Sequence, residues 1–537
     1  MLEAPPQPAT RRNLLDGGYT VALLAVAMVA GYGILASSPA PATTAVTPAA
    51  ATPAVTAAAV ETAPVELPPA PEPPASMSDI VRSPEPPRPA EITVALARPP
   101  AGSVPEPPRP RPEPLKPAPR PARPEPAVEF PWPSPVVSGK VLDGDRKPLA
   151  GASIVVRGVE VRTDADGAFK LEQVPPEATL LVKLPGFEKA SVPPTRGPVE
   201  AVLRPQAIKA AYLTYFGFGD RGIRSRVLDL TARTELNAVV VDVKGDRGWI
   251  IYPSEVPMAQ NIGAQGPATL RDFDGMMADL KSRGIYTIAR IVTFKDNVLA
   301  TARPDLAIMD TRTGKPWIDN EKLAWVDPFQ EEVWAYNIAL GKEAIRRGFD
   351  EVQFDYVRFP TDGKLGAARY AKPNSRETRL PAIAAFLSRA RRELGATGAF
   401  VAADLFGYTA FNENDTDIGQ RIEELAPSLD YICPMVYPSG YHKGIPGYPN
   451  PVQVPYRVVH ESVRLIRKRA GINVVRVRPW LQDFKDYAFD KRIFGVPEVQ
   501  AQIRAAEEAG GAGWMLWNPR NDYTGSALRT KGAVATR

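Results

Sequence analysis

Cysteine is nearly absent from this chain of 537 residues, because Cys433 is the only one. No disulfide can therefore form within the chain, and each folded part must be stable through its own core. Histidine is almost as scarce, with only His442 and His460, and no cysteine cluster accompanies them. We therefore expect no zinc site. The chain also lacks a glycine-rich phosphate cradle and a histidine placed for a Ser-His-Asp triad, which argues against both chemistries.

A block of uninterrupted basic charge is missing too. The formal net charge is +5, but the arginines alternate with glutamate and proline. We therefore expect no nucleic-acid partner. Aspartate-rich strand ends are a possible calcium site, but no loop has a recognisable ligand spacing. No metal and no cofactor is predicted. Proline, by contrast, is abundant, with 60 residues, which is about twice the usual share. This abundance indicates that much of the chain is not globular.

The first apolar segment predicts a membrane anchor at residues 17–37. Residues 1–16 are polar and contain Arg11 and Arg12, and the run that follows is long enough to cross a bilayer, for which about 20 residues suffice. Positive charge ahead of the run predicts a cytoplasmic N-terminus and a single-pass protein whose other domains are periplasmic or extracellular. The alternative is a cleavable signal peptide, because small residues occupy 36–40.

Residues 38–133 are rich in alanine, proline, glutamate and arginine. Such a composition buries too little apolar surface to offset chain entropy, and proline stiffens it toward polyproline II. We interpret the segment as a disordered spacer that holds the later domains away from the membrane. A ligand for a proline-recognising domain is the alternative.

Short alternating strands separated by turns predict a small all-β sandwich at residues 134–205. The motifs Pro148-Leu149-Ala150-Gly151-Ala152 and Thr163-Asp164, followed by Gly167 and Phe169, resemble the carboxypeptidase regulatory-like domain, which is a transthyretin-like sandwich. The resemblance implies a spacer or a chaperoning neighbour of another domain. The acidic turn at Asp164 and Asp166 is interpreted as a turn and not as a calcium site.

From residue 206 to 527, strand and helix patterns alternate, and a tail follows at 528–537. This alternation predicts an α/β fold, the (β/α)₈ TIM barrel, and an open doubly wound sheet is the alternative. The predicted strands are 208–216, 238–244, 286–294, 351–359, 400–406, 431–437, 474–481 and 513–517. The predicted helices are 223–234, 273–283, 331–347, 379–394, 418–425, 456–469 and 498–509.

The fourth predicted strand carries the residue on which the functional hypothesis depends. Side chains alternate along a strand, so Gln353, Asp355 and Val357 should share one face, while Phe354 and Tyr356 share the other. If the second face meets the helices, Asp355 points into the barrel. A buried carboxylate needs a partner, and Arg358 is the nearest candidate along the chain.

Barrel enzymes place their catalytic groups at the carboxyl ends of the strands. The polar and aromatic residues found there are Asp242, Lys244, Asp246, Asp355, Arg358, Asp404, Tyr437, Trp480, Gln482, Asp483, Trp517 and Asn518. Carboxylates among aromatic rings suit glycosidic-bond hydrolysis, which needs one acid to protonate the leaving oxygen and a second to attack or to activate water. Asp355 and Asp404, on neighbouring strands, are the expected pair.

Several runs resemble a family of candidate bacterial glycoside hydrolases whose barrel was long classed as a domain of unknown function. They are Thr214-Tyr215, Asn237 to Lys244, Ile288 to Asp296, Trp325 to Pro328, Phe349 to Pro360 and Pro434 to Ser439. The resemblance implies a glycosidase-like barrel. The fourth strand is also similar to that of chitinase-type barrels, with Asp350 and Asp355 on the first and third acids of the pattern. There, Gln353 replaces the middle aspartate and Val357 the catalytic glutamate, so the proton donor must lie elsewhere.

These observations predict a membrane-anchored enzyme that cleaves an envelope or extracellular polysaccharide. The hypothesis makes Asp355 the nucleophile or stabilising carboxylate and Asp404 the acid/base, with Asp483 or Asp242 next in line. The other residues are assigned to substrate binding, with Arg358 and Lys244 as orienting charges and Tyr437, Trp480 and Trp517 as sugar platforms. The alternative is a non-catalytic carbohydrate-binding or envelope-scaffolding barrel. A carboxyl separation of about 5–5.5 Å would indicate retention and about 6.5–9.5 Å inversion. The oligomeric state is not predicted.

Overall fold

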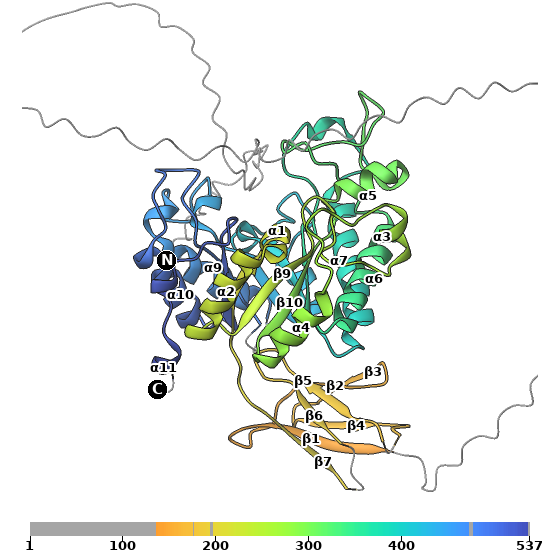
Figure 1. Ribbon diagram of the computed structural model, residues 1–537, viewed down its shortest axis with the longest axis vertical. Coiled ribbons are helices and arrows are strands. Elements are labelled where there is room, and N and C mark those ends of the chain that lie inside the picture. Colours follow the sequence, from red (N-terminus) through yellow and green to blue (C-terminus); the bar gives the residue numbers. More distant parts are fainter. Residues whose placement is uncertain (1–135, 176, 194–196, 472–475, 535–537) are drawn as a thin grey trace, which may run out of the picture. The chain divides into compact units, whose positions relative to one another are not determined.

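The computed structural model describes residues 136–175, 177–193, 197–471 and 476–534, which form a β-sandwich followed by a barrel (Figure 1). The predicted anchor at 17–37 and the predicted spacer at 38–133 lie outside the described residues. In the described part of the chain, no helix has both the length and the apolar composition needed to cross a bilayer.

The sandwich consists of a three-stranded sheet in the order β4-β1-β7 and a four-stranded sheet in the order β3-β2-β5-β6. Between the sheets, Val141, Ile154 and Leu180 are fully buried, as the alternation of apolar residues along the strands requires. The predicted all-β sandwich is confirmed. Its strands are β1 (Val137–Asp143), β2 (Ser153–Val156), β3 (Val159–Arg162), β4 (Ala168–Leu171), β5 (Leu180–Lys183), β6 (Ala190–Val192) and β7 (Val199–Leu203).

The second part is a closed barrel of eight parallel strands in chain order, in which the last strand pairs with the first. This closure confirms the predicted TIM barrel and rules out the doubly wound sheet, which has free edges. Three strands have the predicted bounds, and the others are shorter. The strands are β8 (Ile208–Leu213), β9 (Ala238–Lys244), β10 (Tyr286–Val292), β12 (Glu351–Asp355), β14 (Phe400–Phe406), β15 (Tyr431–Met435), β16 (Trp480–Gln482) and β17 (Gly513–Trp517).

Helices connect successive strands and pack around the barrel (Figure 1). The main ones are α2 (Arg221–Arg233), α4 (Phe273–Ser282), α6 (Glu331–Arg346), α7 (Arg376–Gly395), α9 (Pro455–Arg469) and α10 (Val496–Glu508). Shorter elements lie in the connections: α1 (Tyr215–Gly219), α3 (Pro257–Asn261), α5 (Asn297–Ala302), α8 (Ile422–Leu425), α11 (Lys531–Val534) and the ribbon of β11 (Met309–Asp310) and β13 (Ala368–Arg369).

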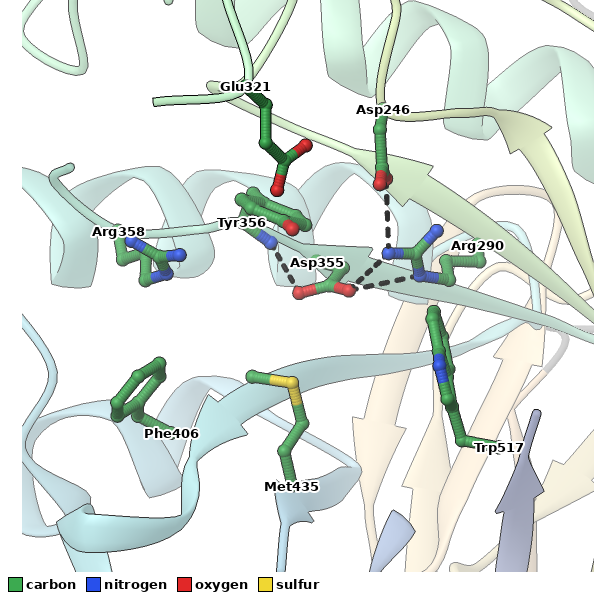
Figure 2. A pocket seen from close by; sticks show the side chains of 9 residues that line it. All are labelled: Asp246, Arg290, Glu321, Asp355, Tyr356, Arg358, Phe406, Met435 and Trp517. Atoms are coloured by element: carbon green, nitrogen blue, oxygen red, sulfur yellow. Dashed lines mark hydrogen bonds and ion pairs between the residues drawn. The ribbon is translucent and has the colours of Figure 1, made fainter. Parts of the chain in front are cut away.

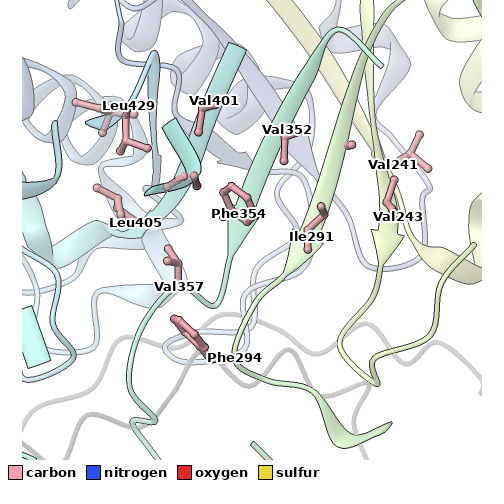
Figure 3. Packing of buried hydrophobic residues seen from close by; sticks show 14 of the residues in the cluster. Val241, Val243, Ile291, Phe294, Val352, Phe354, Val357, Val401, Leu405 and Leu429 are labelled. Atoms are coloured by element: carbon pink, nitrogen blue, oxygen red, sulfur yellow. The ribbon is translucent and has the colours of Figure 1, made fainter. Parts of the chain in front are cut away.

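Alternation along the strands divides the apolar core into two layers. Val352 and Phe354 of β12 belong to the cluster between strands and helices, together with residues such as Val241 and Ile291 (Figure 3). A separate cluster fills the barrel interior and includes Tyr212 and Met515. The intervening residues of β12 therefore point into the barrel, as predicted for Asp355.

Candidate functional site

A pocket opens at the carboxyl ends of the barrel strands (Figure 2). This end of a TIM barrel is where substrate sites are found, because the loops that follow the strands converge there. We call it the mouth pocket. It is lined by Asp246, Arg290, Glu321, Asp355, Tyr356, Arg358, Phe406, Met435 and Trp517.

Arg290 of β10 is the centre of the charged groups in the mouth pocket. Its Nη1 donates to Asp242 Oδ1 at 2.6 Å, and its Nε donates to Asp355 Oδ2 at 3.0 Å. Its side chain is 1% exposed. Burial alone would lower the pKa of Arg290, but the charges of Asp242 and Asp355 raise this pKa well above its ordinary value. Arg290 is therefore a permanent cation that fixes two carboxylates.

Asp355, the last residue of β12, lines the mouth pocket and is 3% exposed. Besides Arg290, it accepts a hydrogen bond at Oδ1 from the backbone N–H of Tyr356 at 2.5 Å. Tyr356 adopts a left-handed conformation with φ of 47°. Such a conformation is unusual for a bulky residue and costs about 1–3 kcal/mol, so the surrounding structure must impose it.

The left-handed residue also corrects the predicted faces beyond Asp355. Val357 was expected on the face of Asp355, but it packs in the strand–helix cluster with Phe354 (Figure 3). Tyr356 was expected among the helices, but it lines the mouth pocket. The physical reason is that the strand ends at Asp355, so strict alternation stops there.

Asp404 of β14 lies beside Asp355 but outside the set of side chains that line the pocket. Its Oδ1 accepts a hydrogen bond from Trp480 Nε1 at 2.7 Å, and its Oδ2 lies 3.9 Å from Arg290 Nε without a hydrogen-bond partner. Burial, and then the neighbouring charge of Asp355, raise the pKa of Asp404 well above its usual range. Both causes favour the protonated form of the Asp404 carboxyl.

Asp242 of β9 is held from three sides. Besides Arg290, it accepts hydrogen bonds at Oδ2 from the Tyr212 hydroxyl at 2.6 Å and from the Tyr215 backbone N–H at 3.1 Å. Burial, partly opposed by the charge of Arg290, raises the pKa of Asp242 to about 6. It lines an adjoining rim pocket, which shares Asp246 and Glu321 with the mouth pocket; the rest of the rim-pocket lining is Tyr212, Thr214, Tyr215, Phe216, Gly245, Arg247, Trp249 and Leu323.

Lys244, which was predicted to orient substrate, lies outside the mouth pocket. Its ammonium forms an ion pair with Asp296 at 2.7 Å, both side chains are fully buried, and it lies over the ring of Tyr336 in α6. The pairing of β9 with β10 shifts register so that Arg290 faces Asp242 but Ile291 faces Lys244. This irregularity turns Lys244 out of the barrel interior, so it contributes to the helix layer and not to the pocket.

The three predicted sugar platforms differ in their access to the mouth pocket. Trp517 lines the pocket and stacks on Tyr212, with ring centroids 4.0 Å apart. Tyr437 and Trp480 are only 1% exposed, so neither offers a free ring face. Trp480 instead holds Asp404, while the Tyr437 hydroxyl is buried without a hydrogen-bond partner. Both belong to the apolar interior beneath the pocket.

Three other predicted binding residues organise loops. Gln482 is fully buried and donates from Nε2 to Ser439 Oγ at 2.7 Å. Asn518 donates from Nδ2 to the Asp483 carbonyl at 2.5 Å. Asp483 accepts hydrogen bonds from the Thr524 hydroxyl at 2.6 Å and backbone N–H at 2.9 Å, and burial raises its pKa to about 6. None of the three lines the mouth pocket.

Two charged residues of the pocket were not anticipated as site residues. Arg290 is the one charged residue in the buried apolar run of β10, and a charge in such a run was a signal that could have been used. Glu321 comes from the long connection between β10 and β12 and forms an ion pair with Lys295 at 2.7 Å. Burial, partly opposed by Lys295, raises the pKa of Glu321. No local pattern in the sequence marks this residue.

Among the described residues, no group of three or more His, Cys, Asp or Glu side chains is arranged to hold a metal ion. The acidic residues of the mouth are instead gathered around Arg290, which is within 4 Å of four carboxylates: Asp242, Asp246, Asp355 and Asp404. The chemistry that this arrangement supports is proton transfer and electrostatic stabilisation between carboxyl groups.

Solved structures resemble parts of the chain. A hypothetical protein from Ruminiclostridium thermocellum is 37% identical, with 36% of this chain and 96% of that chain covered and a TM-score of 0.32. The PgaB (BpsB) glycoside hydrolase domain from Bordetella bronchiseptica is 15% identical, with 59% and 95% covered and a TM-score of 0.43. The GH18 chitinase ChiB from Flavobacterium johnsoniae is 14% identical, with 60% and 91% covered and a TM-score of 0.35. No curated protein matches the chain.

Two family models match the described domains. Residues 136–204 match the model described as "Carboxypeptidase regulatory-like domain". Residues 210–523 match the model described as "Putative glycosyl hydrolase domain", and this match spans the barrel. Because it covers more than half of the 537 residues, the chain belongs to this family of glycosyl hydrolase domains.

Proposed function

We propose that the protein is a glycoside hydrolase that cleaves a cell-envelope or extracellular polysaccharide with a pair of carboxyl groups. One observation carries the proposal. Asp355 and Asp404 stand on neighbouring strands, and an oxygen of each lies within 4 Å of Arg290 Nε, at 3.0 Å and 3.9 Å. Asp355 forms an ion pair with Arg290, whereas burial and the charge of Asp355 raise the pKa of Asp404 and favour its protonated form. Acid-assisted glycoside cleavage requires two neighbouring carboxyl groups in different environments, one of which can donate a proton.

In this mechanism Asp355 is the nucleophile or the stabilising carboxylate. It faces the pocket, and Arg290 and the Tyr356 N–H hold it in place, so little reorganisation is needed when positive charge develops on the sugar. Asp404 is the acid/base, and its unpartnered Oδ2 is the oxygen free to carry the proton. Trp517 supplies a ring at the pocket wall against which a sugar can pack.

Glu321 is the rival candidate for the acid. Unlike Asp404, it lines the mouth pocket, and burial raises its pKa as well. Asp404 is 1% exposed, so its role requires the sugar to reach the pocket floor beside Asp355. The two assignments differ in which variant should lose activity on substrates whose leaving group needs a proton, and a kinetic experiment can therefore distinguish them.

The first experiment incubates the full chain with a panel of bacterial and plant polysaccharides and measures new reducing ends. Asp355→Asn and Asp404→Asn are tested beside it, with Arg312→Gln as a control because Arg312 pairs with Asp310 and does not line the pocket. We expect sugar release by the parent and the control, and a loss of at least about 100-fold in both aspartate variants. No release from any glycan, or release unaffected by both changes, would overturn the proposal.

A second experiment assigns the acid once a cleaved glycan is known. The same sugar is attached to leaving groups of high and low basicity, and kcat/KM is measured for Asp404→Asn and Glu321→Gln. A variant that lacks the general acid should lose much activity on the basic leaving group and little on the acidic one, which departs without a proton. We expect this pattern for Asp404→Asn. The pattern in Glu321→Gln alone would move the role to Glu321.

A non-catalytic carbohydrate-binding barrel is the second candidate function. It is favoured by the burial of Asp355 and Asp404, which are 3% and 1% exposed, and by the covered rings of Tyr437 and Trp480. A binding module would retain glycan on an affinity gel without releasing sugar, and Asp404→Asn would leave this retention unchanged.

We also propose that residues 17–37 anchor the chain in a membrane and that the spacer at 38–133 presents the barrel on the periplasmic or extracellular side. The apolar run and the proline-rich composition support this. Membrane fractionation of the full chain and of a chain lacking residues 1–37 tests it. We expect only the full chain to sediment with membranes, and equal distribution of both would contradict the proposal.

A further inference from the structure

Arg358 differs from Arg290, the other cation that lines the mouth pocket, because no carboxylate of the described chain lies within ion-pair distance of it. It lines the pocket and is 4% exposed. The other cation that lines the pocket, Arg290, forms an ion pair with Asp355, and Lys295, which does not line the pocket, pairs with the pocket residue Glu321. A buried guanidinium without a counter-ion is costly, since arginine does not shed its proton at physiological pH.

Only part of the Arg358 guanidinium is used inside the protein. Its Nη1 donates to the Phe359 carbonyl at 3.0 Å and lies 3.4 Å from Thr361 Oγ1. No described residue accepts a hydrogen bond from its Nε or Nη2, and neither atom is among the buried side-chain atoms without a partner. Figure 2 shows the group at the wall of the pocket, with no dashed interaction to the other residues drawn. Its spare donors therefore face the pocket space.

Aromatic rings hold Arg358 in position. The guanidinium carbon lies 5.3 Å from the ring centre of Trp325, 5.0 Å from that of Tyr356 and 5.5 Å from that of Phe406. Such contacts fix the orientation of a planar cation without neutralising it. Burial lowers the pKa of Arg358, and the nearby acids Asp355, Asp362 and Asp319 only partly oppose the shift. The positive charge of Arg358 is thus held in one position, and the protein supplies no ion-pair partner that would neutralise it.

The acids that line the pocket are each close to a cation, so their negative charge is partly neutralised and repels an incoming anion less. Asp355 is ion-paired with Arg290, Glu321 with Lys295, and Asp246 lies 3.5 Å from Arg290. A ligand carboxylate would match the planar fork of the guanidinium with two parallel hydrogen bonds. Neutral hydroxyl groups would satisfy the donors but would leave the charge uncompensated.

We propose that Arg358 binds the carboxylate of a sugar acid, so that the substrate of the mouth pocket is an acidic polysaccharide containing such residues. This inference rests on the proposed glycosidase function, because it names the substrate class of the same site. Arg358 is then the residue that determines specificity. Its position three residues beyond Asp355, in the same pocket, places the acidic sugar at or next to the cleaved bond.

Titration calorimetry of the full chain tests the proposal with three soluble probes: D-glucuronate, D-glucose and the methyl ester of D-glucuronate. We expect glucuronate to bind at least about 10-fold more tightly than the two neutral sugars, because a hydrogen bond to an ionised group is stronger than one between neutral groups. Equal affinity for glucuronate and its methyl ester would overturn the proposal. This comparison changes the ligand alone and needs no protein variant.

Protein variants locate the effect. Arg358→Gln should abolish the preference for glucuronate, Arg358→Lys should retain part of it, and Arg312→Gln should leave it unchanged; thermal unfolding checks that each variant is folded. A preference that survives in folded Arg358→Gln would contradict the assignment. The affinity for D-glucose 6-sulfate is measured as well. If it binds more tightly than glucuronate, the ligand of Arg358 is a sulfated sugar and the proposed carboxylate is wrong.

The outcomes separate this inference from the proposed function. A chain that cleaves glycans but shows no Arg358-dependent preference for the acid would overturn the inference and leave the glycosidase proposal standing. A chain that binds glucuronate through Arg358 but cleaves no glycan would overturn the glycosidase proposal and support only the acid-binding site.

Discussion

The barrel interior contains two clusters of arginine and carboxylate, one low in the barrel and one at the mouth. In the lower cluster, Glu351 at the start of β12 pairs with Arg478, and both side chains are fully buried. Tyr286 also donates to Glu351 at 3.0 Å. In the mouth cluster, Arg290 is within 4 Å of four carboxylates and borders a pocket.

The difference lies in charge balance. The lower pair is one cation with one anion, whereas the mouth gathers several acids around one arginine, so an acid there must take up a proton or find another cation. The environment of Asp404 favours the uptake of a proton, since burial and the charge of Asp355 raise its pKa well above the usual range. We infer that the lower cluster contributes to folding, while the mouth cluster holds the proton that the chemistry uses.

The largest effect on stability is expected in the lower cluster. Arg478→Met leaves Glu351 buried without its cation, and breaking such a pair costs about 3–5 kcal/mol of unfolding free energy. Asp355→Asn should cost less, because Arg290 keeps Asp242 and Asp246 as partners. Urea denaturation measures both. A larger loss in Asp355→Asn than in Arg478→Met would break the comparison.

Lys244→Met tests whether the cation of β9 belongs to folding, as its outward position indicates. Its removal leaves Asp296 buried without its ion pair, so we expect a loss of about 3 kcal/mol in unfolding free energy. Sugar release per folded molecule should not change, because Lys244 lies outside the mouth pocket. A loss of sugar release with unchanged unfolding free energy would instead show that Lys244 acts in the functional site.

Asp404→Asn sharpens the comparison through pH. The raised pKa means that the folded chain binds a proton that the unfolded chain releases near pH 4, so wild-type stability falls as pH rises above that value. Asparagine is always neutral and avoids this loss. The unfolding free energy of the variant relative to the wild type should therefore increase from pH 4 to pH 8. A flat difference would mean that Asp404 is ionised in the folded protein.

Asp483→Asn should also become more stable relative to the wild type as pH rises, but over a narrower range of pH. The pKa of Asp483 is raised from 3.8 to about 6 by burial, so wild-type stability falls between about pH 4 and pH 6 and is constant above. The variant should gain about 3 kcal/mol relative to the wild type between pH 4 and pH 7. Denaturation at several pH values measures this gain, and its absence would show that Asp483 titrates normally.

Periodicity in the sequence was sufficient to predict the barrel. The strand bounds of β9, β14 and β17 match the prediction, because apolar and β-branched runs there end at turn residues or helix starts. Alternation also placed Asp355 inside the barrel. The predicted strand 351–359 was too long, because the left-handed backbone of Tyr356 follows from tertiary packing that no local pattern encodes.

The candidate site was only partly predictable, because tertiary packing that local sequence patterns do not encode also determines which side chains reach the pocket. Asp242, Asp355 and Asp404 converge because they occupy inward positions near the carboxyl ends of β9, β12 and β14, and Arg290 of β10 lies between the first two strands. Lys244 does not join them, since an irregularity between β9 and β10 reverses its face, and such an irregularity depends on the partner strand. Glu321 comes from a long connection between strands, and its contact with the pocket is set by how that loop folds.

Infrared difference spectroscopy of the carboxyl groups tests the central claim most directly, which is that the mouth holds a protonated acid beside a charged one. At pH 8, Asp242 and Asp483 are ionised, because their pKa values are about 6, whereas Asp404 should remain protonated. We expect a band of a protonated carboxyl group at pH 8 that is lost in Asp404→Asn and kept in Asp483→Asn. Identical spectra of the wild type and Asp404→Asn would contradict the account.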